Sequence, residues 1–263
     1  MRSQVIKSPL RYPGGKSRAT KKLATLFPTE FSSFVEPMVG GGSVSFFVSQ
    51  NYDVPVWVND AQTPLTNFWK AVAEDSETLA NDALALRKYY FDKTKEDRKA
   101  HFQFCKKNAE DPLNFFYLNR TSYSGLGVAG VYFDPTIEGS FTEASCERLR
   151  QAGQVVKDWK ITNLDFTECL TDDPDAFIYL DPPYKIDSNL YGKDGEIHKH
   201  FHHDGFRKSV GDLKSKVMVS YNAEVEWDDW NSYVFPLTYC FRGEHKYSKA
   251  QEKRREVVFR NYD

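Results

Sequence analysis

The sequence has little cysteine and no long apolar run. Its four cysteines are scattered, and none forms a CxxC pair or a cysteine–histidine spacing that would suit a metal. No stretch approaches the roughly 18 consecutive apolar residues of a membrane span, and the mean hydropathy is −0.60. The opening residues, MRSQVIKSPLRYPGGK, contain no apolar signal core. We therefore expect a cytoplasmic protein with reduced thiols, no metal site and no membrane contact.

Charge is nearly balanced over the whole chain but is unevenly spread. The net charge is −2, yet residues 1–22 carry seven Lys or Arg and no acid, whereas residues 165–181 carry six acids and no base. Basic residues also gather in 87–107 and 242–263. Local basic patches are compatible with a polyanionic partner, although ordinary solvated surfaces would look the same.

Short apolar segments alternate with helical ones, which predicts an α/β fold with a parallel sheet. The expected strands are 33–39, 54–58, 161–166, 176–180, 216–221 and 256–260. The middle of the chain breaks this rhythm, with helices expected at 64–74, 77–91, 92–112 and 146–158 and with loops and a hairpin at 113–145. We expect residues 1–61 and 159–263 to form one sheet domain and residues 62–158 to be an insertion.

A glycine run follows the first expected strand. Gly40, Gly41 and Gly42 precede a helical segment, and such a turn lets the backbone approach a cofactor closely. Asp60 lies 18 residues beyond Gly42, at the end of the next strand, where a nucleotide-binding fold places the acid that holds ribose hydroxyls. The run does not complete GxGxxG, and the chain has no GxxxxGK[ST], which argues against NAD and a phosphate loop. The pattern favours a nucleoside cofactor, with a plain turn as the alternative.

The sequence Asp181-Pro182-Pro183-Tyr184 directly follows the apolar segment 176–180. Two prolines can neither continue a sheet nor enter a helix interior, so they hold the chain rigid. The Asp181 carboxylate and the Pro182 carbonyl then form a fixed pair of acceptors beside an aromatic ring. An exocyclic amine on a planar base offers two N–H donors and a π face, which suits this motif. The alternative is a strand-ending turn with a packed tyrosine.

A third motif, Leu10-Arg11-Tyr12-Pro13-Gly14-Gly15-Lys16, forms a tight turn that projects Tyr12 and Lys16. Taken together, the motifs resemble the Dam-type adenine-specific DNA methyltransferases, the alpha group of amino-methyltransferases. The similarity runs from about Leu10 to the C-terminus, in the group's order of cofactor motif, insertion and DPPY. It rests on RYPGGK, FVEPMVGGGSV, VND, FYLNRTSYSGL, NLDF and DPPY.

The resemblance implies a Rossmann-like sheet that binds S-adenosylmethionine (SAM) and carries an inserted, mostly helical target recognition domain. The residues that it assigns to the cofactor are Tyr12, Lys16, Glu36, Pro37, Gly40, Gly41, Asp60, Asp165, Phe166 and Asp181. Many relatives have Asp at the position of Glu36. The residues that it places near double-stranded DNA are Arg11, Asn119, Arg120 and Tyr123.

The same resemblance implies methyl transfer to the N6 amine of a flipped adenine, with Asp181, Pro182, Pro183 and Tyr184 as the catalytic motif. Asp181 and the Pro182 carbonyl would accept the two amine hydrogens, and Tyr184 would stack on the base. No cysteine follows a proline, so the Pro-Cys nucleophile of cytosine carbon-5 enzymes is absent. An enzyme acting on an RNA base or a protein glutamine is one alternative, and a non-catalytic DNA-binding relative is another.

Other features stay outside this assignment. We expect the histidine-rich segment 198–203 to be a surface or DNA-side loop rather than a metal site, and residues 246–255 to be a solvated hairpin. Trp227 and Trp230 are expected to pack in the core. A monomer is the default expectation, and a cognate restriction endonuclease is a possible partner. The recognition sequence, and a host, phage or restriction-modification role, stay open.

Overall fold

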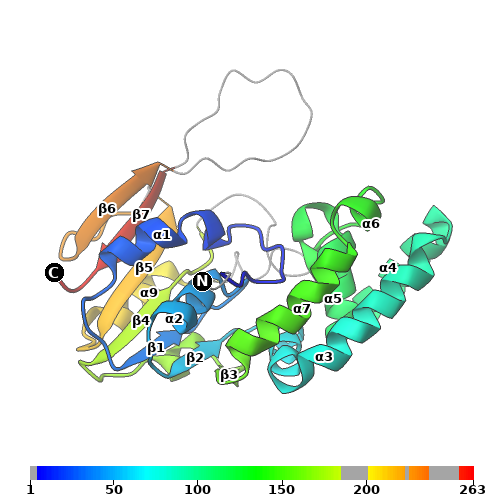
Figure 1. Ribbon diagram of the computed structural model, residues 1–263. Coiled ribbons are helices and arrows are strands. Elements are labelled where there is room, and N and C mark those ends of the chain that lie inside the picture. Colours follow the sequence, from blue (N-terminus) through cyan, green and yellow to red (C-terminus); the bar gives the residue numbers. More distant parts are fainter. Residues whose placement is uncertain (1–4, 185–200, 223–224, 237–254) are drawn as a thin grey trace.

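The computed structural model describes residues 5–184, 201–222, 225–236 and 255–263. A sheet of seven strands stands beside a body of helices (Figure 1). The strands are β1 (Ser33–Glu36), β2 (Val56–Asn59), β3 (Lys160–Thr162), β4 (Ala176–Leu180), β5 (Lys216–Asn222), β6 (Asn231–Pro236) and β7 (Arg255–Arg260).

The strand order is β3-β2-β1-β4-β5-β7-β6. Strands β1 to β5 run parallel, whereas β7 pairs antiparallel with both β5 and β6. The order reverses between β1 and β4, and ligands of open α/β sheets bind beyond the carboxyl ends of the strands at such a reversal. The predicted Rossmann-like sheet is confirmed.

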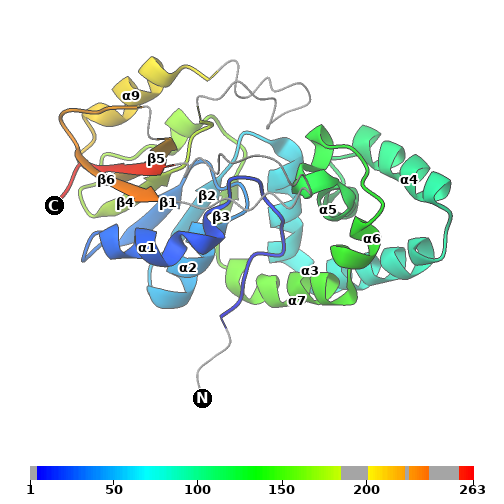
Figure 2. The ribbon, with the colours of Figure 1, turned by 90° about the horizontal axis from the view of Figure 1, so that it is seen from above.

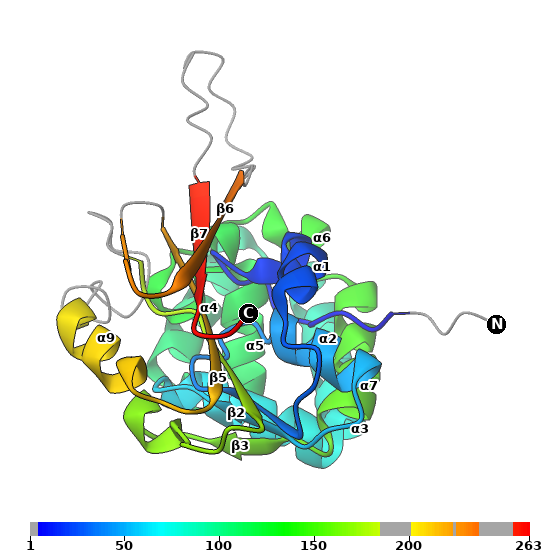
Figure 3. The same cartoon turned by 90° about the vertical axis from the view of Figure 1, so that its left-hand side faces the viewer.

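Helices cover both faces of the sheet. Helices α1 (Thr20–Leu23) and α2 (Ser43–Asn51) lie on one face, and α9 (His203–Gly211) lies on the other (Figures 2 and 3). Alternate strand residues point to opposite faces: Phe34 and Phe177 join the apolar cluster that includes α2, whereas Val35 and Ile178 join the cluster that includes α9. All five residues of β4 are buried, as expected for a central parallel strand.

The helical body is built from the middle of the chain. Its helices are α3 (Thr63–Phe91), α4 (Lys95–Lys107), α5 (Pro112–Thr121), α6 (Thr136–Gly139) and α7 (Glu143–Val156). The chain starts α4 and α7 with capping boxes at Thr94 and Thr142. The helical body contacts the sheet through an aromatic cluster in which the ring centroids of Phe46, Trp69 and Trp159 lie 5.3–5.9 Å apart. One hydrophobic core therefore continues from the sheet into the helices.

The two helices expected at 64–74 and 77–91 are confirmed as the two arms of α3, which is kinked at Asp75, whose φ of −150° and ψ of 76° are non-helical. Other element predictions need correction. The loops expected from residue 113 onward are wrong for α5, where Asp111 caps the first turn and Pro112 stands at its start. The glycines and aromatic residues further along that stretch led us to predict loops for all of it, including this helix. Helix α9 and strand β6 were not predicted, and the strand expected at 161–166 ends at Thr162.

Short 3₁₀ turns complete the description: η1 (Lys16–Arg18), η2 (Ala24–Leu26), η3 (Tyr123–Gly125), η4 (Gly127–Ala129) and η5 (Phe166–Cys169). Residues 246–254 of the expected hairpin and residues 198–200 of the histidine segment lie outside the described residues. Within the described residues, no helix is both long and apolar enough to cross a membrane. Trp227 and Trp230 are buried, and their rings meet edge-on at 5.1 Å, so their predicted packing role is confirmed.

Candidate active site

The glycine run forms the turn between β1 and α2. Gly40 and Gly42 have positive φ values of 47° and 69°, a conformation that side chains rarely adopt. The ring of Tyr12 packs on this turn so closely that a Cβ on Gly40 would lie 2.8 Å from Tyr12 Cε1, and one on Gly41 would lie 2.7 Å from Tyr12 Cβ. The turn and the N-terminal motif therefore require each other.

Asp60 connects the end of β2 to this glycine turn. Its carboxylate accepts the Gly40 N–H at 3.0 Å and the Gln62 N–H at 3.0 Å. Burial raises the pKa of Asp60 to about 6, while the two N–H bonds oppose the rise. The side chain is thus fixed at the carboxyl edge of the sheet, two strands from β4.

Asn59, which the sequence motifs did not single out, ties three strand ends together. Its amide donates to the carbonyls of Pro37 and Leu164, each at 3.0 Å, and its oxygen accepts the Leu164 N–H at 2.8 Å. An amide can donate and accept at once, which suits a residue between the ends of β1 and β3. The VND sequence carried this signal beside Asp60.

Glu36 ends β1 and anchors the start of α2. Its carboxyl accepts the Ser45 N–H at 3.0 Å and forms a short hydrogen bond with the Ser45 hydroxyl. Burial raises the pKa of Glu36 to about 8, against the hydrogen bonds from Ser45, and the charge of Asp181 adds to the rise. The charges of Glu36 and Asp181 thus interact across the point between β1 and β4 at which the strand order reverses.

Asp181 follows β4 and meets the N-terminal motif directly. The Lys16 ammonium lies 2.7 Å and 2.6 Å from the two Asp181 oxygens and donates to the Tyr184 hydroxyl at 2.8 Å. It also lies 3.1 Å from Glu256 on β7, which accepts a hydrogen bond from the Tyr184 hydroxyl at 2.6 Å. The side chains of Lys16 and Glu256 are each 3% exposed and that of Asp181 is 22% exposed. We call Lys16, Asp181, Tyr184 and Glu256 the charged cluster.

The charges in this cluster support one another. Burial by itself would lower the pKa of Lys16, but the negative groups around it, Asp181 foremost, raise the pKa well above its ordinary value. Burial raises the pKa of Asp181 to about 6, with Lys16 opposing the rise and Glu256 adding to it. At neutral pH Asp181 is therefore a carboxylate paired with a cation, which can accept N–H donors.

Tyr184 is held by its ring as well as by its hydroxyl. The ring stacks on Tyr221 of β5, with centroids 6.0 Å apart and planes 19° apart. Tyr221 in turn makes a short hydrogen bond with His203 at the start of α9. This places one residue of the histidine segment behind the DPPY motif. Neither Tyr221 nor Glu256 was a sequence candidate, although Glu256 is an acid beside the apolar residues of a strand.

Asp165 and Phe166 lie beyond the end of β3. The Asp165 carboxylate accepts the Thr167 N–H at 2.9 Å and so caps its own 3₁₀ turn. Phe166 packs against Phe201 and Phe206, with ring centroids 6.1 Å and 5.6 Å away. Their predicted role at the cofactor's adenine ring stays a prediction.

Two of the four residues expected near DNA are buried. The Asn119 side chain accepts the Arg11 N–H at 3.0 Å and donates to the Arg11 carbonyl at 2.7 Å. Arg120 donates to the carbonyls of Pro9 at 3.1 Å and Ser140 at 2.9 Å, and burial lowers its pKa to about 9. Both side chains tie the N-terminal motif to the helical body, and neither faces solvent.

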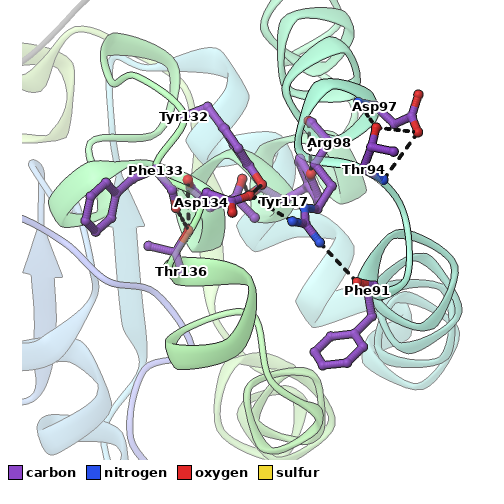
Figure 4. A network of polar contacts seen from close by, with 10 residues as sticks. Phe91, Thr94, Asp97, Arg98, Tyr117, Tyr132, Phe133, Asp134 and Thr136 are labelled. Atoms are coloured by element: carbon purple, nitrogen blue, oxygen red, sulfur yellow. Dashed lines mark hydrogen bonds and ion pairs between the residues drawn. The ribbon is translucent and has the colours of Figure 1, made fainter.

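Tyr123, in contrast, lies at the surface beside Phe133, and we call this exposed pair of rings the aromatic edge. Its ring meets Phe133 edge-on at 5.4 Å, and the two residues are 39% and 42% exposed. Behind them, Asp134 accepts from the Arg98 guanidinium at 3.2 Å and from the Tyr132 hydroxyl at 2.6 Å, which holds this loop against α4 (Figure 4). The half-buried Arg11 reaches the same loop through a 3.4 Å bond to the Ser122 carbonyl.

Comparison with known proteins identifies the family. A family model of the D12 class N6 adenine-specific DNA methyltransferases matches residues 12–245. The chain belongs to this family. It is an adenine-specific DNA methyltransferase, and DNA is its substrate. The resemblance inferred from the motifs is confirmed.

Named relatives agree with this assignment. The type II methyltransferase M.MjaIII of Methanocaldococcus jannaschii is 29% identical over 208 residues, which cover 68% of this chain and 70% of that protein. The type II methyltransferase M1.LlaDCHI of Lactococcus lactis subsp. cremoris is 24% identical across 96% of this chain and 94% of its own. The DNA adenine methylase of Haemophilus influenzae is 27% identical across 66% of this chain and 63% of its own.

Proposed function

We propose that this D12-class enzyme takes its methyl group from SAM and transfers it to the N6 amine of an adenine flipped out of double-stranded DNA. The observation that carries the proposal is the position of Asp181. It lies at the reversal of strand order, paired with Lys16 and beside Tyr184, where the ends of β1 and β4 meet.

The residues around the glycine turn fit SAM. The Asp60 carboxylate accepts two backbone N–H bonds in the described part of the chain, and an ionised carboxylate has about four acceptor sites. It can therefore also receive ribose hydroxyls. We assign the cofactor to Tyr12, Lys16, Glu36, Pro37, Gly40, Gly41, Asp60, Asp165, Phe166 and Asp181. When bound, SAM supplies an electrophilic methyl group on its sulfonium.

The DPPY motif would prepare the adenine amine. The amine nitrogen is a weak nucleophile because its lone pair is conjugated with the ring. Asp181 and the Pro182 carbonyl accept its two hydrogens, favour a pyramidal nitrogen and match the positive charge that develops there. Pro183 keeps the backbone rigid, and stacking on Tyr184 contributes about 1–3 kcal/mol. This gain offsets part of the few kcal/mol that flipping the base costs.

We assign residues 62–158 to target recognition and residues 1–61 and 159–263 to the catalytic domain. Tyr123 and Arg11 are proposed to contact DNA directly, because the aromatic edge is exposed and Arg11 adjoins its loop. Asn119 and Arg120 are proposed to position that loop and the N-terminal motif from inside. The names of the type II relatives lead us to propose a restriction-modification role with a cognate endonuclease. A cytoplasmic monomer completes the proposal.

The test is methyl transfer from labelled SAM to unmethylated genomic DNA, followed by digestion to nucleosides. We expect label in N6-methyladenine and its loss in Asp181→Ala. Because Asp181 is also assigned to the cofactor, a calorimetric titration should show weakened SAM binding in this variant, and transfer should stay absent at SAM concentrations that saturate it. Sequencing of the modified DNA gives the recognition site. Label in cytosine, or full transfer by Asp181→Ala, contradicts the proposed chemistry.

A further inference from the structure

Glu256 is a buried acid that the proposed reaction does not use. It lies on β7, opposite Asn222 of β5, and its side chain is 3% exposed. One of its oxygens, Oε1, accepts a hydrogen bond from the Tyr184 hydroxyl at 2.6 Å and lies 3.1 Å from Lys16 Nζ. It therefore contacts two members of the charged cluster that flank Asp181.

Lys16 occupies both oxygens of Asp181. The ammonium lies 2.7 Å from one oxygen and 2.6 Å from the other. An ionised carboxylate has about four acceptor sites, so an adenine amine that donates to Asp181 shares its oxygens with Lys16 and weakens these contacts. The Lys16 ammonium is buried, and weaker pairing with its counter-ion destabilises a buried cation strongly. A second carboxylate within reach of Lys16 removes this difficulty.

We propose that Glu256 is a positioning residue that keeps Lys16 and Tyr184 in place while the target amine competes with Lys16 for Asp181. The inference rests on the proposed function, in which Asp181 accepts an N–H of the adenine. As the base enters, the Lys16–Asp181 ion pair weakens, and the Lys16–Glu256 pair that is already present continues to balance the charge of Lys16. No covalent bond forms or breaks in this step, and no proton is transferred.

The decisive variant is Glu256→Gln, which keeps the size and the acceptor oxygen but removes the charge. Lys16 then has Asp181 as its carboxylate partner in the cluster and leaves it less readily. We expect the single-turnover rate of methyl transfer to fall about 10- to 100-fold, in keeping with a lost charged contact. The KM for DNA should change much less, because phosphate contacts elsewhere dominate binding. Glu226→Gln, at an exposed acid outside the cluster, is the matched control.

A pH profile separates this role from a merely structural one. The groups that act on Asp181 from the surrounding elements are Lys16, Glu36, Tyr179, Tyr184 and Glu256. Because the charge of Glu256 raises the pKa of Asp181, its removal should move the acidic limb of the transfer rate to lower pH. A variant that only loosens packing would leave the limb in place.

Glu256→Asp supplies the second measurement, and it decides the matter if the glutamine variant is too unstable to purify. It keeps the charge but shortens the reach to Lys16 and Tyr184. We expect a reduced rate with the acidic limb at its wild-type pH. Wild-type rates in both variants, or a slow Glu256→Gln with an unmoved limb, overturn the inference. Full activity of Asp181→Asn would instead overturn the proposed function on which it rests.

Discussion

Three carboxyl groups stand at the carboxyl ends of neighbouring strands: Glu36 and Asp60, which are buried, and Asp181, which is partly buried. Burial raises the pKa of each, to about 8, about 6 and about 6. Each is nonetheless held by donors, from Ser45, from two backbone N–H groups and from Lys16 respectively. The pH dependence of the methylation rate and of stability reports proton uptake by these side chains, and it therefore tests the site at the scale of residues.

The methylation rate should depend on the ionisation of Asp181. Below its pKa of about 6 the carboxyl becomes protonated and loses both its pairing with Lys16 and acceptor capacity. We expect kcat/KM to fall by about tenfold per pH unit below that point and to level off above it. Initial rates on a duplex substrate across this range measure the effect, with circular dichroism as a check on folding. A flat profile through the acidic range would contradict the assignment of Asp181 as amine acceptor.

Glu36 should make the protein less stable as pH rises. Its folded-state pKa of about 8 exceeds the ordinary value of 4.5, so between these values the folded chain binds a proton that the unfolded chain has released. The free energy of unfolding then falls by at most about 1.4 kcal/mol per pH unit in that window. Glu36→Gln should remove this part of the decline, as measured by urea unfolding at several pH values. Exposed Glu30→Gln is the control, and an unchanged slope in Glu36→Gln would contradict the prediction.

At the scale of elements, the contact between α3 and α7 shapes the helical body. Gly153 of α7 lies against Ser76, directly after the bend of α3 at Asp75. A Cβ on Gly153 would lie 2.0 Å from Ser76 Oγ and 2.5 Å from Ser76 Cβ. The glycine lets the two helices approach closely where one of them changes direction.

Gly153→Ala should therefore push α3 and α7 apart. We expect a loss of about 1–3 kcal/mol in stability from overpacking, seen as a lower melting temperature. Gly139→Ala is the matched control, since an added Cβ there meets nothing within 4 Å. It should be neutral or slightly stabilising. Equal melting temperatures for the two variants would show that the helices move apart without cost.

For the whole molecule, binding to DNA should be strongly salt-dependent despite a net charge of −2. Basic residues concentrate locally, with seven Lys or Arg and no acid in residues 1–22. Each phosphate neutralised adds about −0.9 to the slope of log affinity against log salt. We expect a slope steeper than about −3, measured by fluorescence anisotropy of a labelled duplex. A slope near zero would mean that phosphate contacts contribute little.

Sequence patterns predicted the parts of the molecule that depend on local chemistry. The glycine turn, Asp60 and DPPY each follow an apolar strand, so their place at the carboxyl edge of the sheet could be foreseen. Lys16 and Asp181 are 165 positions apart, and resemblance to a family rather than spacing assigned both to the cofactor. Their direct contact was not predicted. Glu256 and Tyr221 could not be foreseen, because the parallel pairing of β5 with β4 brings Tyr221 to Tyr184 and the antiparallel addition of β7 beside β5 brings Glu256 there. Asn119 and Arg120 looked like surface polar residues, since burial by distant backbone carbonyls leaves no local pattern.

The aromatic cluster of Phe46, Trp69 and Trp159 bears on how enzymes of this kind acquire new recognition sequences. A chimera that exchanges residues 62–158 as a unit replaces Trp69 and sets the retained Phe46 and Trp159 against a foreign helix. An exchange limited to the loop of Tyr123 and Phe133 leaves all three rings with their native neighbours. We expect grafts of this loop to yield folded enzymes with altered sites more often than transplants of the entire helical body.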